Sequence, residues 1–387
     1  MEGTLSSHQL SPSSWNRFEE CPRKYWLSRQ RLPRKASMPA SMGNAIHNSV
    51  EEICNLDVSN RDDSETGWLS KSMKEILDKH WEIEKKIFLE TPRRPRWKPH
   101  LISKAREGFI GALNILFIKS KQSEKKFSEI SVGDWKNIQS ILLLNEGTLV
   151  SEDGKLIGRL DLLVNDLDNN GQSKGWIVAD LKTGKPPQKD LNERVIRQLL
   201  FYRDLLKETT DDYPLVIAEG WYSSNQEVYP AIGESVLIDA RKAWEKMKLT
   251  SEPFIGTPNF QSCRFCEYKA WCPDWWVARS EGVLSDSEMF RDEVVRLIRF
   301  DETSGAALFE RQSPLGKDGE VIESEIRFGG FVKDRAFEQI SGLISSGYEG
   351  PIFLGSIRAE GKIIHLGDWS EILRWSPLLK SIREISR

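Results

Sequence analysis

Apolar residues recur at helical spacing through the first third of the chain. Ile46, Val50 and Ile53 lie three or four positions apart, and residues 101–118 repeat this spacing. Side chains three and four positions apart share one face of an α-helix, so each such run indicates a helix with one buried face. The pattern predicts mainly helices over residues 40–144.

The pattern changes to that of strands in the middle of the chain. Residues 147–185 hold apolar runs separated by Gly/Asn/Ser clusters, which predicts three strands joined by turns. A helix is predicted at about 190–207, a strand at 214–222 and another helix near 234–248. The order of elements predicts a mixed α/β fold with helices around a central sheet.

The last hundred residues are dominated by short strand-like segments. They follow an acidic, Ser-rich stretch at 280–293 that is typical of a linker, and one helical pattern at 335–345 interrupts them. The strand-like segments are 293–300, 305–311, 324–333, 350–358 and 361–369. A small β-barrel of the OB type fits these segments, and so does any other β-rich accessory domain. We expect two domains, at 1–280 and 288–387.

Composition narrows the class of protein. The chain has 387 residues with 55 basic and 58 acidic side chains, so it is not a wholesale polyanion binder. No apolar run approaches the ~18 residues of a membrane helix, and the N-terminus lacks a signal-peptide pattern, which predicts a soluble, cytoplasmic protein without membrane contacts. Two basic segments with interleaved aromatic residues, 17–35 and 91–106, are either solvated surface or part of a nucleic-acid groove.

Three of the five cysteines fall within ten positions, in the sequence CRFCEYKAWC at 263–272. An odd total with this clustering argues against a secreted disulfide framework and for a metal or cluster site. Cys54 stands apart among apolar helical positions, and we expect it to be a buried core thiol.

A carboxylate and a lysine end one of the predicted strands. In WIVADLKTGK, Asp180 and Lys182 lie two positions apart and therefore point to the same face of a strand. Upstream, Asp161 interrupts an otherwise apolar strand, where a carboxylate is costly unless it is paired or bound to a metal. Two converging carboxylates suit Mg²⁺ or Mn²⁺. The alternatives are a common D-x-K pair without function and a strand-end Asp bonded to backbone amides.

Three further polar residues lie in the predicted helices. His47 follows Gly43 by four positions near the expected start of a helix, and it is either a metal ligand or a structural histidine. Gln198 and Tyr202 are four positions apart and share one helix face, which is equally consistent with an ordinary amphipathic helix.

The order of these motifs resembles a known family. G-x-x-x-H, G-x-x-D, D-x-K-T-G and Q-x-x-x-Y follow one another as in the RecB-type branch of the PD-(D/E)XK nucleases, across about residues 10–275. The resemblance implies a restriction-endonuclease-like α/β core with a helical insertion. It implies that Mg²⁺ or Mn²⁺ is bound by His47, Asp161, Asp180 and the main-chain carbonyl of Leu181. It also implies that Lys182 acts on the attacking water or the phosphate, and that the helix carrying Gln198 and Tyr202 lies near DNA as part of the catalytic site.

The N-terminus supplies a fourth cysteine. LSPSSWNRFEECPRKYWL is similar to the family's S-x-S-x-x-x-x-(aromatic)-x-x-C-P signature. The combination resembles the iron–sulfur branch, which includes CRISPR-adaptation nucleases and AddAB-type nuclease subunits. The resemblance implies a structural [4Fe–4S] cluster held by Cys21, Cys263, Cys266 and Cys272. Zinc is the rival occupant, since four cysteines also suit Zn²⁺.

The resemblance implies a metal-dependent DNA nuclease, with exonuclease action on single-stranded DNA ends in repair, recombination or defence. The alternative is a cluster-stabilised DNA-binding subunit of a helicase–nuclease or repair complex, with a helicase or repair partner docked on the C-terminal domain. A zinc-ribbon DNA binder without catalysis would leave Asp161, Asp180 and Lys182 unexplained. No G-x-x-x-x-G-K-[ST] motif is present, so the chain itself is no ATP-driven helicase.

Overall fold

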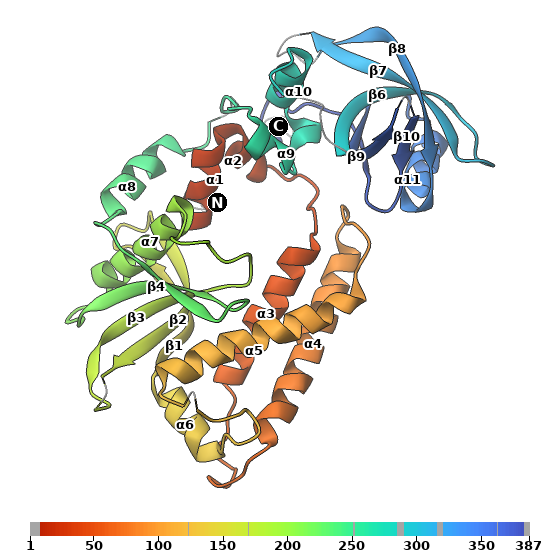
Figure 1. The fold of residues 1–387 in the computed structure, drawn as a ribbon. Helices are drawn as coiled ribbons and strands as arrows, with labels where there is room; N and C mark the ends of the chain where they lie inside the picture. The colour runs from red at the N-terminus through yellow and green to blue at the C-terminus, as the bar shows by residue number, and fades with distance from the viewer. Residues whose placement is uncertain are drawn as a thin grey trace, which may run out of the picture. The chain divides into compact units, whose positions relative to one another are not determined.

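The computed structural model describes residues 8–122, 124–168, 170–250, 252–284, 290–315, 320–361 and 363–382. The chain divides into two compact units, each built from segments that are distant in sequence (Figure 1). The first unit comprises residues 1–16, 36–90 and 97–248, and the second comprises 17–35, 91–96 and 249–387. The predicted division between 280 and 288 stays a prediction, while compactness groups residues 249–280 with the C-terminal strands.

Helices make up the first half of the first unit, as predicted. They are α3 (Met38–Cys54), α4 (Trp68–Glu90), the short η1 (Pro99–Leu101), α5 (Ile102–Lys119) and α6 (Val132–Ser140). Their apolar faces, Cys54 among them, form one core with residues of the sheet. Helix α3 begins with the Ser37 cap and Pro39, so His47 lies in its middle and not near its start as expected.

The sheet of the first unit has five strands in the order β1-β2-β3-β4-β5. They are β1 (Leu142–Val150), β2 (Ile157–Leu167), β3 (Ser173–Lys182), β4 (Val216–Tyr222) and β5 (Glu227–Ala231). Among the described strands of this sheet, β3 and β4 are the parallel pair, and the crossover between them is α7 (Glu193–Thr209), followed after β5 by α8 (Leu237–Lys246). Strand β1 begins five residues before the predicted segment, because the apolar run at 141–144 already pairs with β2.

A glycine lets α5 approach the end of β4. A Cβ atom at Gly111 would lie 1.9 Å from the carbonyl oxygen of Ser223, which is backbone and cannot rotate away. We therefore expect Gly111→Ala to destabilise the protein by about 2 kcal/mol, measured as a shift of the urea midpoint. The control is Gly342→Ala in the second unit, where no atom lies within 4 Å of the added Cβ. There the better helix propensity of alanine should raise stability slightly, and equal effects at both sites would contradict the packing argument.

Three short helices of the second unit lie at or beside the cysteines in the chain and share a core with three C-terminal strands. The helices are α2 (Pro22–Ser28), α9 (Phe260–Arg264) and α10 (Pro273–Ser280), with η2 (Lys269–Trp271) between the last two. Trp26 of α2 packs in one apolar cluster with Trp276 of α10 and Phe353 of the C-terminal strands. Helix α1 (Pro12–Glu20) precedes α2 in the chain.

The C-terminal strands form a ring. They are β6 (Phe290–Phe300), β7 (Ala306–Leu315), β8 (Glu320–Val332), β9 (Ile352–Glu360), β10 (Ile363–Leu366) and β11 (Glu371–Arg374), with α11 (Asp334–Ser345) between β8 and β9. Strand β10 pairs in parallel with β8 and antiparallel with β9, and β9 pairs with β6. The order β6-β7-β8-β10-β9 therefore closes on itself around an apolar core. This confirms a β-rich C-terminal region.

The predicted linker at 280–293 is shorter than expected. Helix α10 still includes Ser280, and β6 begins at Phe290, because apolar residues there pair with β9. Residues 285–289 of this stretch lie outside the described chain.

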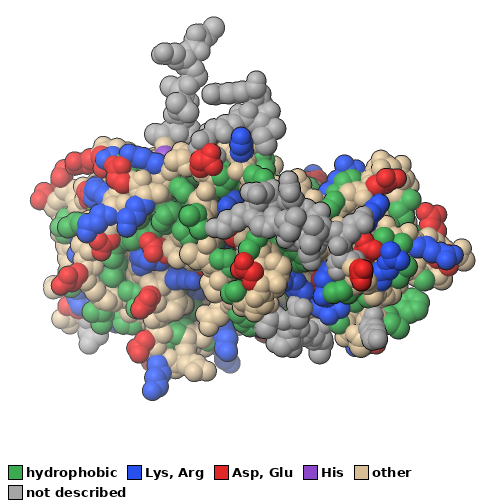
Figure 2. Space-filling model, turned by 90° about the horizontal axis from the view of Figure 1, so that it is seen from above, with side chains coloured by type: hydrophobic (Ala, Val, Ile, Leu, Met, Phe, Trp, Pro, Cys, Tyr) green, Lys and Arg blue, Asp and Glu red, His purple; other side chains and the backbone are tan. Residues whose placement is uncertain are grey.

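Charged side chains of both signs are interspersed over the face shown in Figure 2. This distribution accords with the nearly equal totals of 55 basic and 58 acidic residues. Within the described ranges, no helix is long and apolar enough to cross a membrane.

Candidate active site

Four elements of the first unit bring the predicted site residues together. Helix α3 carries His47, β2 carries Asp161, and β3 carries Asp180 and Lys182. Helix α7, the crossover after β3, adds the last two, Gln198 and Tyr202. Strands β2 and β3 are antiparallel, with Leu162 opposite Ala179. Asp161 and Asp180 are the next residues at this end of the pairing, so they lie across from each other on the two strands.

Lys182, Asp180 and Gln198 form a closed set of polar contacts. The Lys182 ammonium lies 2.5 Å from Oδ2 of Asp180 and donates to Oε1 of Gln198 at 3.0 Å. The Gln198 amide nitrogen donates to Oδ1 of Asp180 at 2.9 Å and to the Tyr202 hydroxyl at 3.1 Å. The glutamine thus fixes both partners of the ion pair, which holds the lysine head in one place.

Asp180 is buried, and its electrostatics follow from that. Its side chain is 6% exposed, and burial raises its pKa to about 6, with the Asp161 charge adding to the rise while Lys182 and His47 oppose it. Among the described residues, Oδ2 of Asp180 has no hydrogen-bond partner of ordinary geometry beside its ion pair with Lys182. A buried carboxylate oxygen in this state is suited to a cation.

His47 and Asp161 form the other side of the site. Nδ1 of His47 lies 3.6 Å from Oδ2 of Asp161, and the same oxygen accepts a hydrogen bond from the Leu181 amide at 2.8 Å. Burial alone would lower the pKa of His47, but the Asp161 hydrogen bond and the charges of both aspartates outweigh it, so the pKa lies above its usual value. Asp161 is thus held by a strand amide while it faces the imidazole.

The glycine of the G-x-x-D motif makes room for the tyrosine of α7. A Cβ atom at Gly158 would lie 3.0 Å from the Tyr202 ring, so the bare glycine lets that ring lie against β2. Burial, aided by the charge of Asp180, raises the pKa of Tyr202, which keeps its hydroxyl protonated at neutral pH.

Sequence reasoning missed an acidic neighbour of this site. Glu51 follows His47 by one turn of α3, and burial together with the charge of Glu146 raises its pKa. Glu146 in turn pairs with Arg159 of β2. The spacing of four between His47 and Glu51 is the signal that would have revealed a shared helix face.

The comparisons decide the family. The PD-(D/E)XK nuclease superfamily matches residues 9–273, which include all of the residues described above. The chain belongs to the PD-(D/E)XK nuclease superfamily. Membership implies a metal-dependent nuclease that binds DNA, and nucleases of this superfamily generally use Mg²⁺ or Mn²⁺.

Two further comparisons leave the assignment to the PD-(D/E)XK nucleases unchanged. No curated protein matches the chain. A solved structure titled "Crystal structure of SSO0001" is similar at 13% identity, covering 65% of this chain and 92% of that chain with a TM-score of 0.26. A similarity this low supports no conclusion about the fold or the function.

The donor types at this site suit a divalent cation, but the described side chains are not gathered closely enough to hold one. Two carboxylates, an imidazole and a strand carbonyl are oxygen and nitrogen donors of the kind that Mg²⁺ and Mn²⁺ accept. In the described part of the chain, no group of three or more His, Cys, Asp or Glu side chains is gathered closely enough to hold a metal ion. The ion pair with Lys182 occupies the Asp180 oxygen that a cation would take.

The four predicted cluster cysteines line one pocket of the second unit. They share it with Lys24, Lys269 and Trp275, among others. Cys21 and Cys272 occupy equivalent positions, since each is the N-cap of a helix whose first residue is proline. None of the five cysteines forms a disulfide in the described chain. The N-terminal cysteine thus lies with the C-terminal three.

Proposed function

We propose that the protein is a Mg²⁺- or Mn²⁺-dependent deoxyribonuclease whose catalytic centre is the Asp180–Lys182–Gln198 set with Asp161 and His47. The observation that carries this proposal is the lysine head fixed between Asp180 and Gln198, next to a buried carboxylate oxygen. A structural ion pair would not require a second carboxylate and a histidine on neighbouring elements.

In this proposal, the cation is held by His47, Asp161, Asp180 and the carbonyl of Leu181. When bound, it polarises the scissile phosphate and stabilises the leaving oxyanion. Lys182 donates to a phosphate oxygen or orients the attacking water. Gln198 keeps the ammonium in place through its 3.0 Å contact, and Tyr202 anchors the glutamine at 3.1 Å.

We infer that the enzyme works as an exonuclease on single-stranded DNA ends. The support is the family's usual activity together with the closed ring of five strands in the second unit. A five-stranded ring with a helix between its third and fourth strands suits an OB-like barrel, a fold that often binds oligonucleotides. The same barrel would dock a helicase or repair partner if the chain works within a complex.

The test is cleavage of single-stranded DNA labelled at either end, with Mg²⁺ or Mn²⁺. Products that shorten progressively from one end support the exonuclease and reveal its polarity. Products cut internally overturn the exonuclease assignment. Tight binding without cleavage by cluster-loaded protein overturns the nuclease in favour of a DNA-binding subunit.

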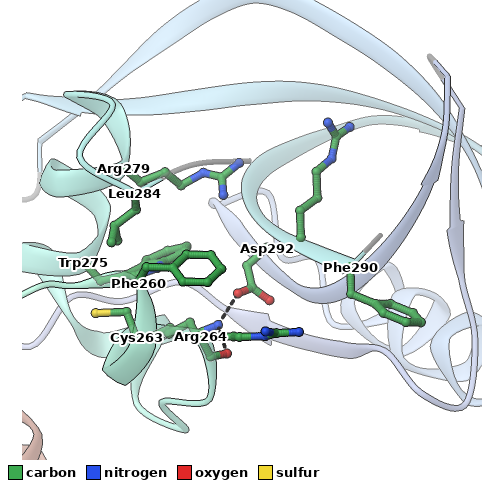
Figure 3. Close-up of a pocket in the computed structure, with 10 residues that line it drawn as sticks. Phe260, Cys263, Arg264, Trp275, Arg279, Leu284, Phe290 and Asp292 are labelled. Carbon is green, nitrogen blue, oxygen red and sulfur yellow. Dashed lines mark hydrogen bonds and ion pairs between the residues drawn. The ribbon is translucent and has the colours of Figure 1, made fainter. Parts of the chain in front are cut away.

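We also propose a [4Fe–4S] cluster on Cys21, Cys263, Cys266 and Cys272. The support is their shared pocket and the two Cys-Pro helix starts at Cys21 and Cys272. A four-iron cluster takes one thiolate on each iron, so its ligands stand farther apart than those of a single ion. Lys24 and Lys269 also line the pocket, and each is already paired with a carboxylate, Glu20 and Asp292 respectively (Figure 3 shows Asp292).

Cation binding by Asp180 should depend on pH. The folded-state pKa of about 6 lies above the usual 3.8, so the folded apoprotein holds this proton more tightly than the unfolded chain does. This carboxyl alone then lowers stability by up to about 3 kcal/mol as the pH rises from about 4 past 6. A bound cation reverses that loss, because it needs the charged carboxylate.

We therefore expect Mn²⁺ to raise the melting temperature near pH 8 and to lose most of this effect near pH 5. The measurement is a thermal melt with and without Mn²⁺ across that range. Asp180→Asn should abolish the Mn²⁺ shift at both pH values. A shift that is independent of pH, or that persists in Asp180→Asn, would exclude Asp180 as a ligand.

A further inference from the structure

Tyr222 is a polar residue of the first unit's sheet that the mechanism above does not use. It ends β4, which runs beside β3 (Figure 1), and it lies directly across from Lys182, just as Gly220 lies across from Asp180. Residues that pair in register project from the same face of a sheet. Tyr222 therefore stands next to Lys182 on the face that carries the candidate site.

A glycine and a second tyrosine hold the Tyr222 ring in place. A Cβ atom at Gly220 would lie 3.4 Å from Cε2 of Tyr222, so the ring leans back along β4 over this glycine, toward the row that holds Asp180. Tyr229 of β5 is paired with Gly220, and its ring meets that of Tyr222 edge-on, with centroids 5.2 Å apart and planes at 79°. These contacts give the ring a fixed direction toward the candidate site.

The Tyr222 hydroxyl lies within reach of the charges of the site. Burial raises its pKa, the charge of Lys182 opposes this rise and the charge of Asp180 adds to it. Since even an unperturbed tyrosine is protonated at neutral pH, the hydroxyl is available there as a hydrogen-bond donor.

This donor has no partner within the protein. Among the described residues, the Tyr222 hydroxyl makes no hydrogen bond, and its oxygen is not one of the buried polar atoms that lack a partner, so it reaches water although the residue is only 5% exposed. The neighbouring Tyr229 differs, because its hydroxyl donates to Glu227 at 2.7 Å and accepts from Asn225 at 2.8 Å. Tyr222 thus offers a fixed donor beside Lys182 that a ligand can take without breaking a bond of the protein.

We propose that Tyr222 is a further catalytic residue of the nuclease: its hydroxyl donates a hydrogen bond to a non-bridging oxygen of the scissile phosphate. It does so on the β4 side of Lys182, whereas Asp161 lies on the opposite side, on β2. A fixed donor stabilises the charge that develops on a phosphoryl oxygen during the reaction. This role deepens the proposed nuclease function and rests on it.

The test is single-turnover cleavage of end-labelled single-stranded DNA with saturating Mn²⁺ by Tyr222→Phe, which removes the hydroxyl and keeps the ring. We expect the rate to fall about ten- to a hundredfold, as for the loss of one hydrogen bond to a charged group. DNA affinity, measured in a Lys182→Ala background so that the DNA is not cut, should stay within about twofold. Tyr229→Phe is the matched control and should cut at the wild-type rate, because its hydroxyl is already bonded within the protein.

A thermal melt separates catalysis from structure. Tyr222→Phe breaks no hydrogen bond of the described protein, so its melting temperature should stay within about 2 °C of the wild type. A slower rate that comes with a larger fall in melting temperature would assign the hydroxyl a structural role and overturn the proposal. Cleavage by Tyr222→Phe at the wild-type rate, or an equal loss in Tyr229→Phe, would also overturn it and leave the nuclease standing. Wild type that cuts no DNA refutes the nuclease itself, and this role with it.

Discussion

Replacing Lys182 by alanine should reduce DNA cleavage by about 10²- to 10³-fold while DNA binding stays within about twofold. The lysine head is fixed 2.5 Å from Asp180 and 3.0 Å from Gln198, so the enzyme does not have to order it during the reaction. Loss of one such positioned charge removes stabilisation from the transition state and leaves the ground-state complex almost unchanged. The measurement is single-turnover cleavage with saturating Mn²⁺.

Lys185, three residues further on and exposed, provides the matched control. Lys185→Ala should cut DNA at the wild-type rate. Gln198→Ala should keep the Lys182 ammonium but remove one of the contacts that hold it in place. Its cleavage rate should therefore fall less than that of Lys182→Ala. Wild-type cleavage by Lys182→Ala would show that the D-x-K pair is structural. A parallel loss of binding and cleavage would assign the lysine to substrate binding.

Replacing Cys21 by serine should remove the cluster and destabilise the second unit by about 3 to 5 kcal/mol. The proposed cluster would join Cys21 to cysteines about 240 residues later, and a link across so long a loop restricts the unfolded chain strongly in the entropic account. Serine is itself a good N-cap, so α2 keeps its start and only the thiolate is lost. The measurements are iron and sulfide per chain after anaerobic purification, followed by a thermal melt.

The fifth cysteine is the control for this substitution. Cys54 is buried in the apolar core of the first unit and does not line the pocket of the other four cysteines. Cys54→Ala should keep all of its iron. Colourless wild-type protein loaded with zinc would refute the cluster in favour of a Zn²⁺ site. Full iron in Cys21→Ser would show that this cysteine is not a ligand.

Much of this architecture could be predicted from periodicity. The amphipathic spacing of α3 and α5 and the turn clusters around β2 and β3 are local signals that packing did not override. The first and last residues of the strands were harder to predict. Strand β1 begins before its predicted start because its first residues gain partners only from β2. A single sequence does not contain that pairing.

For the candidate site, the sequence allowed the residues to be predicted but not the contacts between them. The motif order singled out Asp161, Asp180, Lys182, Gln198 and Tyr202 together with His47. The fold places His47 beside Asp161 and joins the other four by polar contacts, and their roles stay a prediction. Glu51 was missed because a glutamate on a helix is usually solvated.

The interleaved division of the chain has a consequence for biosynthesis. Residues 17–35 belong to a unit whose other main segment begins at 249, and Trp26 finds its core partners only there. At about 5 to 20 residues per second, a ribosome needs roughly 10 to 50 s to supply those partners. Helix α2 stays without these partners for that time, and the second unit can close only after its segment from residue 249 on has been made. Nascent chains should therefore need a chaperone at this segment, and any truncation before residue 249 should leave it unprotected.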